Sequence, residues 1–215
     1  MTPLSKEYPK KLKEMEPIHQ RDIPNILYYR GIIDLNKSKI VAIVGARDAS
    51  SYALKTSYKF AYELAKEGFT IISGMARGVD TYAHKGALDA GGNTIAVLGN
   101  GLDIAYPSSN ERLMKDIIKN GMVISEYPIG TLPLKHHFPK RNRIISMLSD
   151  FVLVIEAKER SGSLITARLA LDYGMDVGCI PGNINSEFCK GSNSLLQEGA
   201  FLILDAKDII ELFRR

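Results

Sequence analysis

Short apolar runs alternate with longer amphipathic segments along most of this chain. Each run is rich in β-branched residues and is bounded by glycine or polar residues, as expected for strands that are buried on both faces. The runs that we predict to be strands are Ile40–Gly45, Phe69–Gly74, Asn93–Gly99, Met122–Glu126, Phe151–Ala157, Asp176–Gly182 and Ala200–Leu204.

The segments between these runs carry apolar residues at helical spacing. In Ser51–Gly68 they recur every three or four positions, and the final glycine suits a helix stop. Asn110 can cap a helix that begins at Glu111. That helix is predicted to end at Lys119. The other predicted helices are Val79–Ala90, Arg141–Leu148, Ser163–Tyr173, Ser192–Glu198 and Ala206–Phe213. This alternation predicts an α/β fold: a Rossmann-like, doubly wound, mostly parallel sheet with helices on both faces.

The first 39 residues follow a different pattern. Four prolines are scattered among them and there is little periodicity. We expect residues 1–39 to form an extension that packs on the main body, with an edge strand at Ile26–Tyr29. Residues 40–215 then form the Rossmann-like domain.

Composition narrows the class of protein only modestly. Apolar residues make up 45% of the 215 residues and charged residues 24%, which argues against disorder. The net charge of +4 is too small by itself to indicate a polyanionic partner. Cys179 and Cys189 are the only cysteines and lack zinc-site spacing, and no apolar run reaches the ~20 residues that span a bilayer. We expect a cytoplasmic protein without membrane contact, metal or cofactor.

Cations gather in the loops that follow the predicted strands. In an open α/β sheet these loops meet at one edge, where ligands bind near the switch in strand order. Arg47 follows the first strand and Arg77 follows the second. The segment after the fourth strand adds Lys135, Lys140, Arg141 and Arg143. The arrangement of charge therefore predicts a ligand with several phosphates.

Three of these cations follow Pro139, where we predict a helix to begin. Partial positive charge at a helix start disfavours cations and favours anions, so we expect a phosphate to lie there. Phe138, between the cations, offers an aromatic face on which a base can stack. The alternatives are ion pairs to Glu126 or Asp150, packing of Phe138 against the helix, and structural salt bridges for the two loop arginines.

Other candidates would bind phosphate through hydrogen bonds. Glycine lets the backbone approach an oxyanion closely, and hydroxyl or amide side chains can donate to it. These candidates are Gly45, Gly74, Asn142, Ser161, Gly162 and Thr166. The glycines also suit tight turns, and both roles stay open.

Standard catalytic and nucleotide-binding motifs are missing. The loop at Gly45 is not GxGxxG, and no GxxxxGK[ST] or GxSxG is present. The four histidines form no ligand-spaced or triad-like set. Asp80 and Glu126 lie near this edge of the sheet, but each could cap a helix or pair with an arginine as well as serve in catalysis. We therefore assign no catalytic residue.

Several multi-residue motifs occur together and in order. They are VGAR (Val44–Arg47), SGMARGVDTYAHKGAL (Ser73–Leu88), GNGLDIAYPSSN (Gly99–Asn110), ISEYP (Ile124–Pro128), FPKRNRIISMLSD (Phe138–Asp150), VIEAKERSGSLITARLA (Val154–Ala170) and IPGNI…KGSNSLLQEGA (Ile180–Ala200). With them the sequence resembles the DNA-processing protein A family, also called DprA or Smf, over Ile40–Phe213.

The resemblance implies a non-enzymatic protein that binds single-stranded DNA. It further implies that the protein protects incoming DNA, helps load a RecA-type recombinase during natural transformation, and pairs as a homodimer. Whether double-stranded DNA is also bound stays open. Many relatives add a sterile-alpha-motif-like domain and a winged helix, which this sequence does not match. The alternative is a nucleotide phosphoribohydrolase-like enzyme on a similar fold, although PGNINSE (Pro181–Glu187) lacks the paired glycines of its motif.

Overall fold

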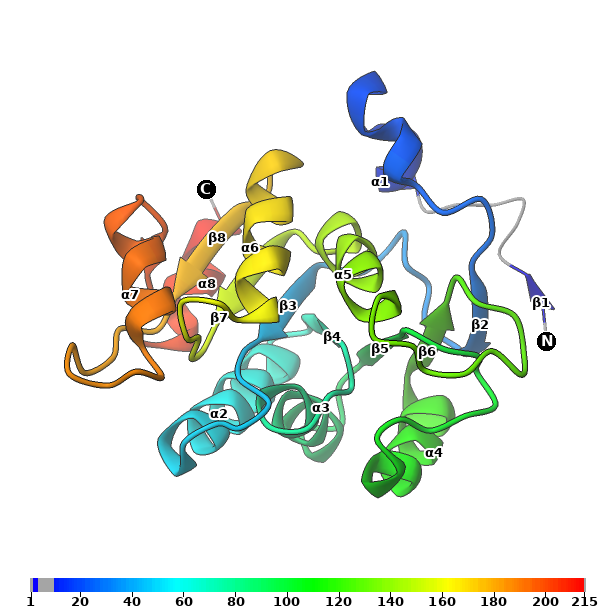
Figure 1. The fold of residues 1–215 in the computed structure, drawn as a ribbon, viewed down its shortest axis with the longest axis horizontal. Helices are drawn as coiled ribbons and strands as arrows, with labels where there is room; N and C mark the ends of the chain where they lie inside the picture. The colour runs from blue at the N-terminus through cyan, green and yellow to red at the C-terminus, as the bar shows by residue number, and fades with distance from the viewer. Residues whose placement is uncertain (1, 4–9, 215) are drawn as a thin grey trace.

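The computed structural model describes residues 2–3 and 10–214, in which nine strands form one sheet (Figure 1). The strand order is β1-β2-β6-β5-β4-β3-β7-β8-β9. The strands are β1 (Thr2–Pro3), β2 (Tyr28–Gly31), β3 (Ile40–Val44), β4 (Thr70–Ser73), β5 (Thr94–Leu98), β6 (Met122–Ser125), β7 (Phe151–Val154), β8 (Asp176–Cys179) and β9 (Phe201–Leu202).

The strands β6, β5, β4, β3, β7, β8 and β9 are parallel to one another, and β2 is antiparallel to both of its neighbours, β1 and β6. The chain proceeds from β3 through β4 and β5 to β6 in one direction and then crosses to β7 on the other side of β3. The switch in strand order therefore lies between β3 and β7. This is the position at which open α/β sheets bind their ligands.

Helices cover both faces of the sheet (Figure 1). One face carries α2 (Ser51–Lys66), α3 (Val79–Asp89), α4 (Glu111–Asn120) and α8 (Ala206–Leu212), and the other carries α5 (His137–Leu148), α6 (Gly162–Asp172) and α7 (Lys190–Gln197).

Strand β3 shows how the sequence makes two cores. Ile40, Ala42 and Val44 pack in the cluster that holds residues of α5 and α6. Val41 and Ile43 face the opposite way and pack with residues of α2 and α3. All five residues are buried, as a strand between two helical layers requires. The predicted α/β fold, with its mostly parallel sheet and two helical layers, is confirmed.

Helix α5 begins four residues earlier than predicted, at His137 rather than Arg141. Pro139 fits within its first turn because the N–H that proline lacks would have no partner there. Arg141 and Arg143 consequently lie in the second turn, where the helix dipole acts weakly. The electrostatic conflict predicted for the helix start is therefore much reduced for these two residues.

Asn110 precedes α4 as predicted, but its side chain makes no capping hydrogen bond. Its Nδ2 instead donates to Met75 O over 3.0 Å and to Thr81 Oγ1 over 2.8 Å. The residue therefore joins the start of α4 to the loop that follows β4.

The N-terminal segment packs beside α5 through α1 (Lys10–Lys13) and a 3-10 helix, Pro17–Asp22. Leu12, Leu27 and Ile33 are buried in the same cluster as α5 and α6. The edge strand predicted at Ile26–Tyr29 corresponds to β2, which begins two residues later and is not at the edge, because it lies between β1 and β6. In the described part of the chain, no helix combines the length and apolar character that crossing a membrane requires.

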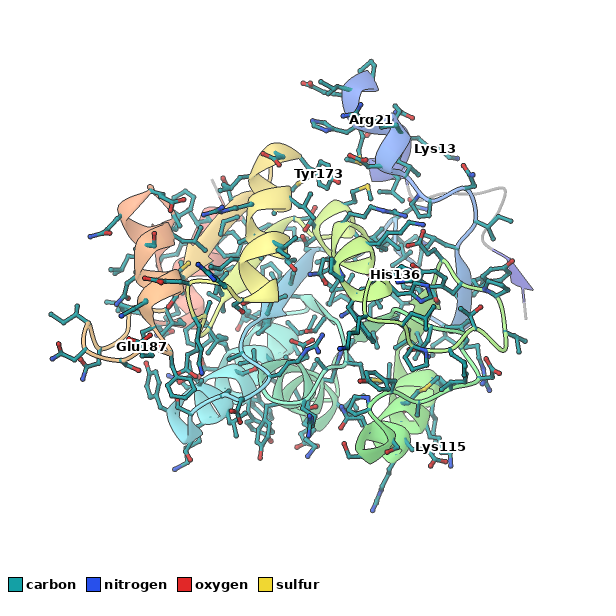
Figure 2. All side chains as sticks on the ribbon, in the orientation of Figure 1. Lys13, Arg21, Lys115, His136, Tyr173 and Glu187 are labelled. Carbon is teal, nitrogen blue, oxygen red and sulfur yellow. The ribbon has the colours of Figure 1, made fainter. Side chains whose placement is uncertain are left out.

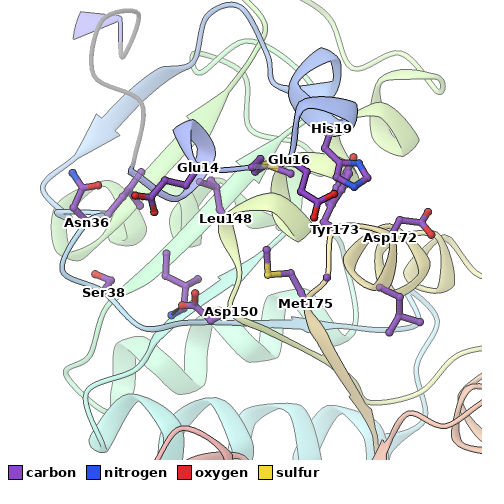
Figure 3. A pocket seen from close by; sticks show the side chains of 15 residues that line it. Glu14, Glu16, His19, Asn36, Ser38, Leu148, Asp150, Asp172, Tyr173 and Met175 are labelled. Carbon is purple, nitrogen blue, oxygen red and sulfur yellow. Dashed lines mark hydrogen bonds between the residues drawn. The ribbon is translucent and has the colours of Figure 1, made fainter.

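A cavity of about 590 Å³ lies between this segment and the amino ends of β3, β7 and β8 (Figure 3). Four carboxylates line it, from Glu14, Glu16, Asp150 and Asp172. Their negative charge makes this cavity unsuitable for phosphate, and it lies at the edge of the sheet opposite the predicted ligand edge.

His84 is fully buried in α3 and contributes a pH-dependent term to stability. Its Nδ1 lies 2.7 Å from Thr94 Oγ1, and its Nε2 has no hydrogen-bond partner among the described residues. Burial lowers the pKa of His84 to about 3, and the positive charge of Arg141 acts in the same direction. The imidazole is therefore neutral in the folded protein at neutral pH.

We predict that stability falls as the pH drops below ~6.5, the ordinary pKa of histidine in an unfolded chain. Below that value the unfolded chain binds a proton that the folded chain does not. The free energy of unfolding should then fall by about 1.4 kcal/mol per pH unit. Urea unfolding from about pH 5 to about pH 7.5 measures this, and His84→Asn should lack this component of the slope. Equal slopes for the two proteins would contradict the prediction.

Candidate nucleic-acid interface

Two cavities open where the strands end, beside the switch between β3 and β7. The first, which we call the switch-point cavity, measures about 340 Å³ and is lined by Val44, Gly45, Arg47, Ala76, Asp80, Phe138, Pro139, Arg141, Asn142, Ile145, Ser161, Gly162, Ser163 and Thr166. The second, which we call the aromatic cavity, measures about 220 Å³ and is lined by Arg47, Gly74, Ala76, Arg77, Ala105, Tyr106, Pro107, Ser108, Phe138 and Arg141. Phe138 lines both and lies between them.

The start of α6 supplies hydrogen-bond donors to the switch-point cavity. Ser161 caps the helix, with its Oγ accepting from Ser163 N over 3.3 Å, and the two hydroxyl oxygens lie 2.6 Å apart. Gly162 is exposed, and a Cβ built on it would meet no atom within 4 Å. Thr166 lies one turn further on. Hydroxyls and free N–H groups at a helix start favour an anion.

Arg141 lies beneath both cavities and is only 3% exposed. Its Nη1 donates to Gly74 O over 2.7 Å and also to Val97 O, and its Nε donates to Asn142 Oδ1 over 3.3 Å. The guanidinium thus joins the carboxyl ends of β4 and β5 to α5. Burial lowers the pKa of Arg141 to about 10, while the nearby Asp80 carboxylate opposes that shift. The side chain remains a cation at neutral pH.

Only glycine fits at position 74, because the Arg141 guanidinium occupies the space that a side chain would need. A Cβ at that position would lie 2.4 Å from Nη2 of Arg141. Its N–H donates to Asp80 Oδ2 over 3.1 Å, as Ala76 N does over 3.2 Å. Burial raises the pKa of Asp80, and Arg141 acts against that rise. Gly74 and Asp80 therefore shape the loop after β4, in which Met75 takes a left-handed backbone with φ of 56°.

Gly45 is also constrained by packing, because a Cβ there would lie 2.6 Å from Val79 Cγ2. Asn142 is mostly buried, and its Nδ2 donates to Gly162 O over 3.1 Å. The glycine and the amide therefore hold the walls of the switch-point cavity. Their contact with phosphate stays a prediction.

Arg47 is exposed and stacks on Phe138. Its Cζ lies 5.3 Å from the ring centroid, and the Cζ of Arg141 lies 5.9 Å from it. Arg47 has no carboxylate within 4 Å among the described residues, and the same holds for the exposed Arg77 and Lys135. The salt-bridge alternative for the two loop arginines is therefore not what the structure shows.

Arg143 has the partner that the ion-pair alternative proposed. Its Nη2 pairs with Glu126 Oε2, and its Nη1 donates to Asp22 O over 2.6 Å. The side chain is only 13% exposed. Lys140 lies 3.3 Å from the same carboxylate oxygen but is 55% exposed. Arg143 thus ties α5 to β6 and to the N-terminal segment, whereas Lys140 retains a face toward solvent.

The structure brings most of the predicted site residues together. Those that line a cavity are Gly45, Arg47, Gly74, Arg77, Phe138, Arg141, Asn142, Ser161, Gly162 and Thr166. Lys135, Lys140 and Arg143 line neither. His136 occupies the N-cap position of α5 but makes no side-chain capping hydrogen bond (Figure 2).

Tyr106 lines the aromatic cavity but is not among the site residues predicted from the sequence. The ring is 43% exposed and its centroid lies 5.3 Å from that of Phe138. Its position in the loop after a buried strand was the available signal.

A sequence model of the family described as DNA recombination-mediator protein A matches residues 1–214. The chain belongs to this family. DNA processing protein DprA of Streptococcus pneumoniae is 47% identical over 192 residues, which cover 89% of this chain and 68% of that protein. Protein Smf of Escherichia coli is 44% identical over 191 residues, covering 88% of this chain and 51% of that protein. The chain thus spans only about half of the second relative. The family predicted from the motifs is confirmed.

A solved structure of DNA processing protein A from Helicobacter pylori has a similar fold. That Helicobacter pylori protein has a single-stranded DNA binding mode that is called unique. The TM-score is 0.86 at 34% sequence identity, with 97% of this chain and 93% of that chain covered. The fold and the family together make this a DNA-processing protein.

We predict that Arg143→Ala lowers the free energy of unfolding by about 2–4 kcal/mol, because it leaves the buried Glu126 carboxylate with Lys140 alone. Urea denaturation measures the change. The matched control is Arg47→Ala, which removes an exposed guanidinium without a carboxylate partner and should change stability by less than about 0.5 kcal/mol. Equal stability of the two variants would show that the Arg143 contacts do not stabilise the fold.

Proposed function

We propose that this protein binds single-stranded DNA across the carboxyl edge of its sheet, and that it does so without catalysis. The observation that carries the proposal is the exposed Arg47 stacked on Phe138 at the mouth of the switch-point cavity. A guanidinium beside an aromatic ring combines the two contacts that single strands require, a cation for phosphate and a flat face for a base.

The charges around the cavities support a bound polyanion. Arg47, Arg77 and Lys135 are exposed cations without carboxylate partners in the described part of the chain, and Lys140 is half exposed. Beneath them, Arg141 adds a buried positive charge that solvent screens weakly. We propose that the exposed cations contact phosphate, and that Arg141 and Arg143 stabilise the structure of the site.

The hydrogen-bonding groups at the start of α6 support the same ligand. Ser161, Gly162 and Thr166 border the switch-point cavity at a helix start, where a phosphate oxygen is favoured. Asn142 and Gly45 complete the wall opposite. One phosphate placed there would lie beside Arg47.

Carboxylates near the cavities are engaged in structural bonds, which supports a non-enzymatic role. Asp80 accepts from two backbone N–H groups, and both oxygens of Glu156 accept from Ser50, over 2.9 Å and 2.7 Å. His137 Nδ1 bonds Gly99 O, and its ring stacks on Tyr127. Each of these groups therefore has a structural partner, and we assign none of them to catalysis.

The wider role rests on membership of the family. We propose that the protein acts in the cytoplasm as a homodimer, protects incoming strands and helps load a RecA-type recombinase during natural transformation. These steps depend on surfaces outside the two cavities.

Binding to an oligo-dT strand should weaken steeply with salt. For single strands the slope of log K against log salt concentration is about −0.7 per phosphate neutralised. Arg47→Ala should therefore weaken binding and make the slope shallower by about 0.7. Fluorescence anisotropy over a salt series measures both quantities.

Lys119→Ala is the matched control, because Lys119 is an exposed cation at the end of α4, far from the ligand edge of the sheet. It should change neither quantity. A salt-independent affinity, or the same slope for wild type and Arg47→Ala, would refute the phosphate contact. A double-stranded oligonucleotide of equal length shows whether the site prefers single strands.

A further inference from the structure

The two cavities on either side of Phe138 differ in chemistry. The switch-point cavity is bordered by hydroxyls, an amide and a helix start. The aromatic cavity has Tyr106, Pro107 and Phe138 in its walls, with Arg77 at its side. One strand of nucleic acid offers groups of both kinds, since each nucleotide carries a phosphate and a flat base.

We propose that the aromatic cavity holds one unstacked nucleobase against Tyr106, while the adjoining phosphate occupies the switch-point cavity. This inference rests on the proposed binding of single-stranded DNA. It assigns the base contact to Tyr106, a residue in the loop after β5, and gives Phe138 the position of a divider between base and phosphate.

The exposure of the rings favours Tyr106 as the platform. Arg47 lies over the Phe138 ring at 5.3 Å, so Phe138 is covered in part by a cation. Tyr106 is 43% exposed, and its ring is tilted by 33° from that of Phe138 at a centroid separation of 5.3 Å. A base placed on the open side of Tyr106 would extend this aromatic pair, which is a favourable arrangement of flat rings.

The size of the cavity favours a single base. Its volume of about 220 Å³ is below the ~300–1,000 Å³ that is typical of pockets for drug-sized ligands. A stacked run of bases would not fit, whereas one base turned out of its stack would. Because every base has a π-face, such a site tolerates any sequence.

The walls of the cavity are fixed before a ligand binds. Asn110 joins the loop after Tyr106 to Met75 and Thr81. Asn100 Nδ2 donates to Gly101 O over 2.9 Å and to Ile104 O over 2.7 Å. A platform held in this way loses little conformational freedom on binding, so more of the stacking energy contributes to affinity.

The test compares two probes that carry the same number of phosphates. One is an oligo-dT strand, and the other is a strand of equal length built from abasic tetrahydrofuran nucleotides. Stacking of one base on an aromatic ring should make wild type prefer oligo-dT by at least ~5-fold and up to ~150-fold. Tyr106→Ala should lose oligo-dT affinity by a factor in that range and keep its affinity for the abasic strand.

Two further variants separate stacking from charge and from folding. Tyr106→Phe keeps the ring and should restore the preference for bases that Tyr106→Ala loses. Lys135→Ala removes an exposed cation that lines neither cavity, and it should weaken binding of both probes by the same factor. Thermal unfolding of each variant confirms that the fold is retained.

The outcomes distinguish failure of the proposed base site from failure of the proposed binding of single-stranded DNA. If wild type binds neither probe, both proposals fail. If wild type binds oligo-dT and Tyr106→Ala retains the full preference over the abasic strand, the base site is refuted while DNA binding stands. Equal loss of both probes in Tyr106→Ala would also refute it, because that result indicates a general structural role for the ring.

Discussion

The ligand edge of this protein depends on one buried cation. Arg141 donates to the carbonyl oxygens of Gly74 and Val97, which end two neighbouring strands, and it does so from the second turn of α5. A buried guanidinium without hydrogen bonds would be very unfavourable, so the loops must supply oxygen atoms at these positions. The requirement sets the path of the chain after β4 and the orientation of the helix that carries Phe138. Arg47 and Tyr106 can flank that ring because Arg141 has already placed it.

Much of the fold could be predicted from the sequence, because both faces of the sheet are buried. Ile40–Val44 has no polar residue to mark an exposed face, and the structure has helices on each side of it. The start of α5 was harder to predict. Proline and two histidines carry no strong helix signal, and only the folded chain shows that His137 is its first residue.

The site was predicted with less success in its details than in its location. The loops that follow parallel strands must meet at one edge, so Arg47, Arg77 and Phe138 could be grouped from sequence spacing alone. The same reasoning cannot tell an exposed cation from a buried one. Arg143 and Lys140 are three residues apart on one helix, yet one is 13% exposed and the other 55%. Their difference depends on Asp22, which is over a hundred positions away in sequence, and no local pattern reveals that contact.

The bond from Arg143 to Asp22 has a thermodynamic consequence for the whole chain. Tyr173 Oη also donates to the Asp22 carboxylate, over 3.3 Å, so the N-terminal segment is attached to both α5 and α6. These are the two helices that border the switch-point cavity. Removing the segment would therefore leave the Arg143 guanidinium and the Tyr173 hydroxyl each without one hydrogen-bond partner, on the two helices that form a wall of the ligand site.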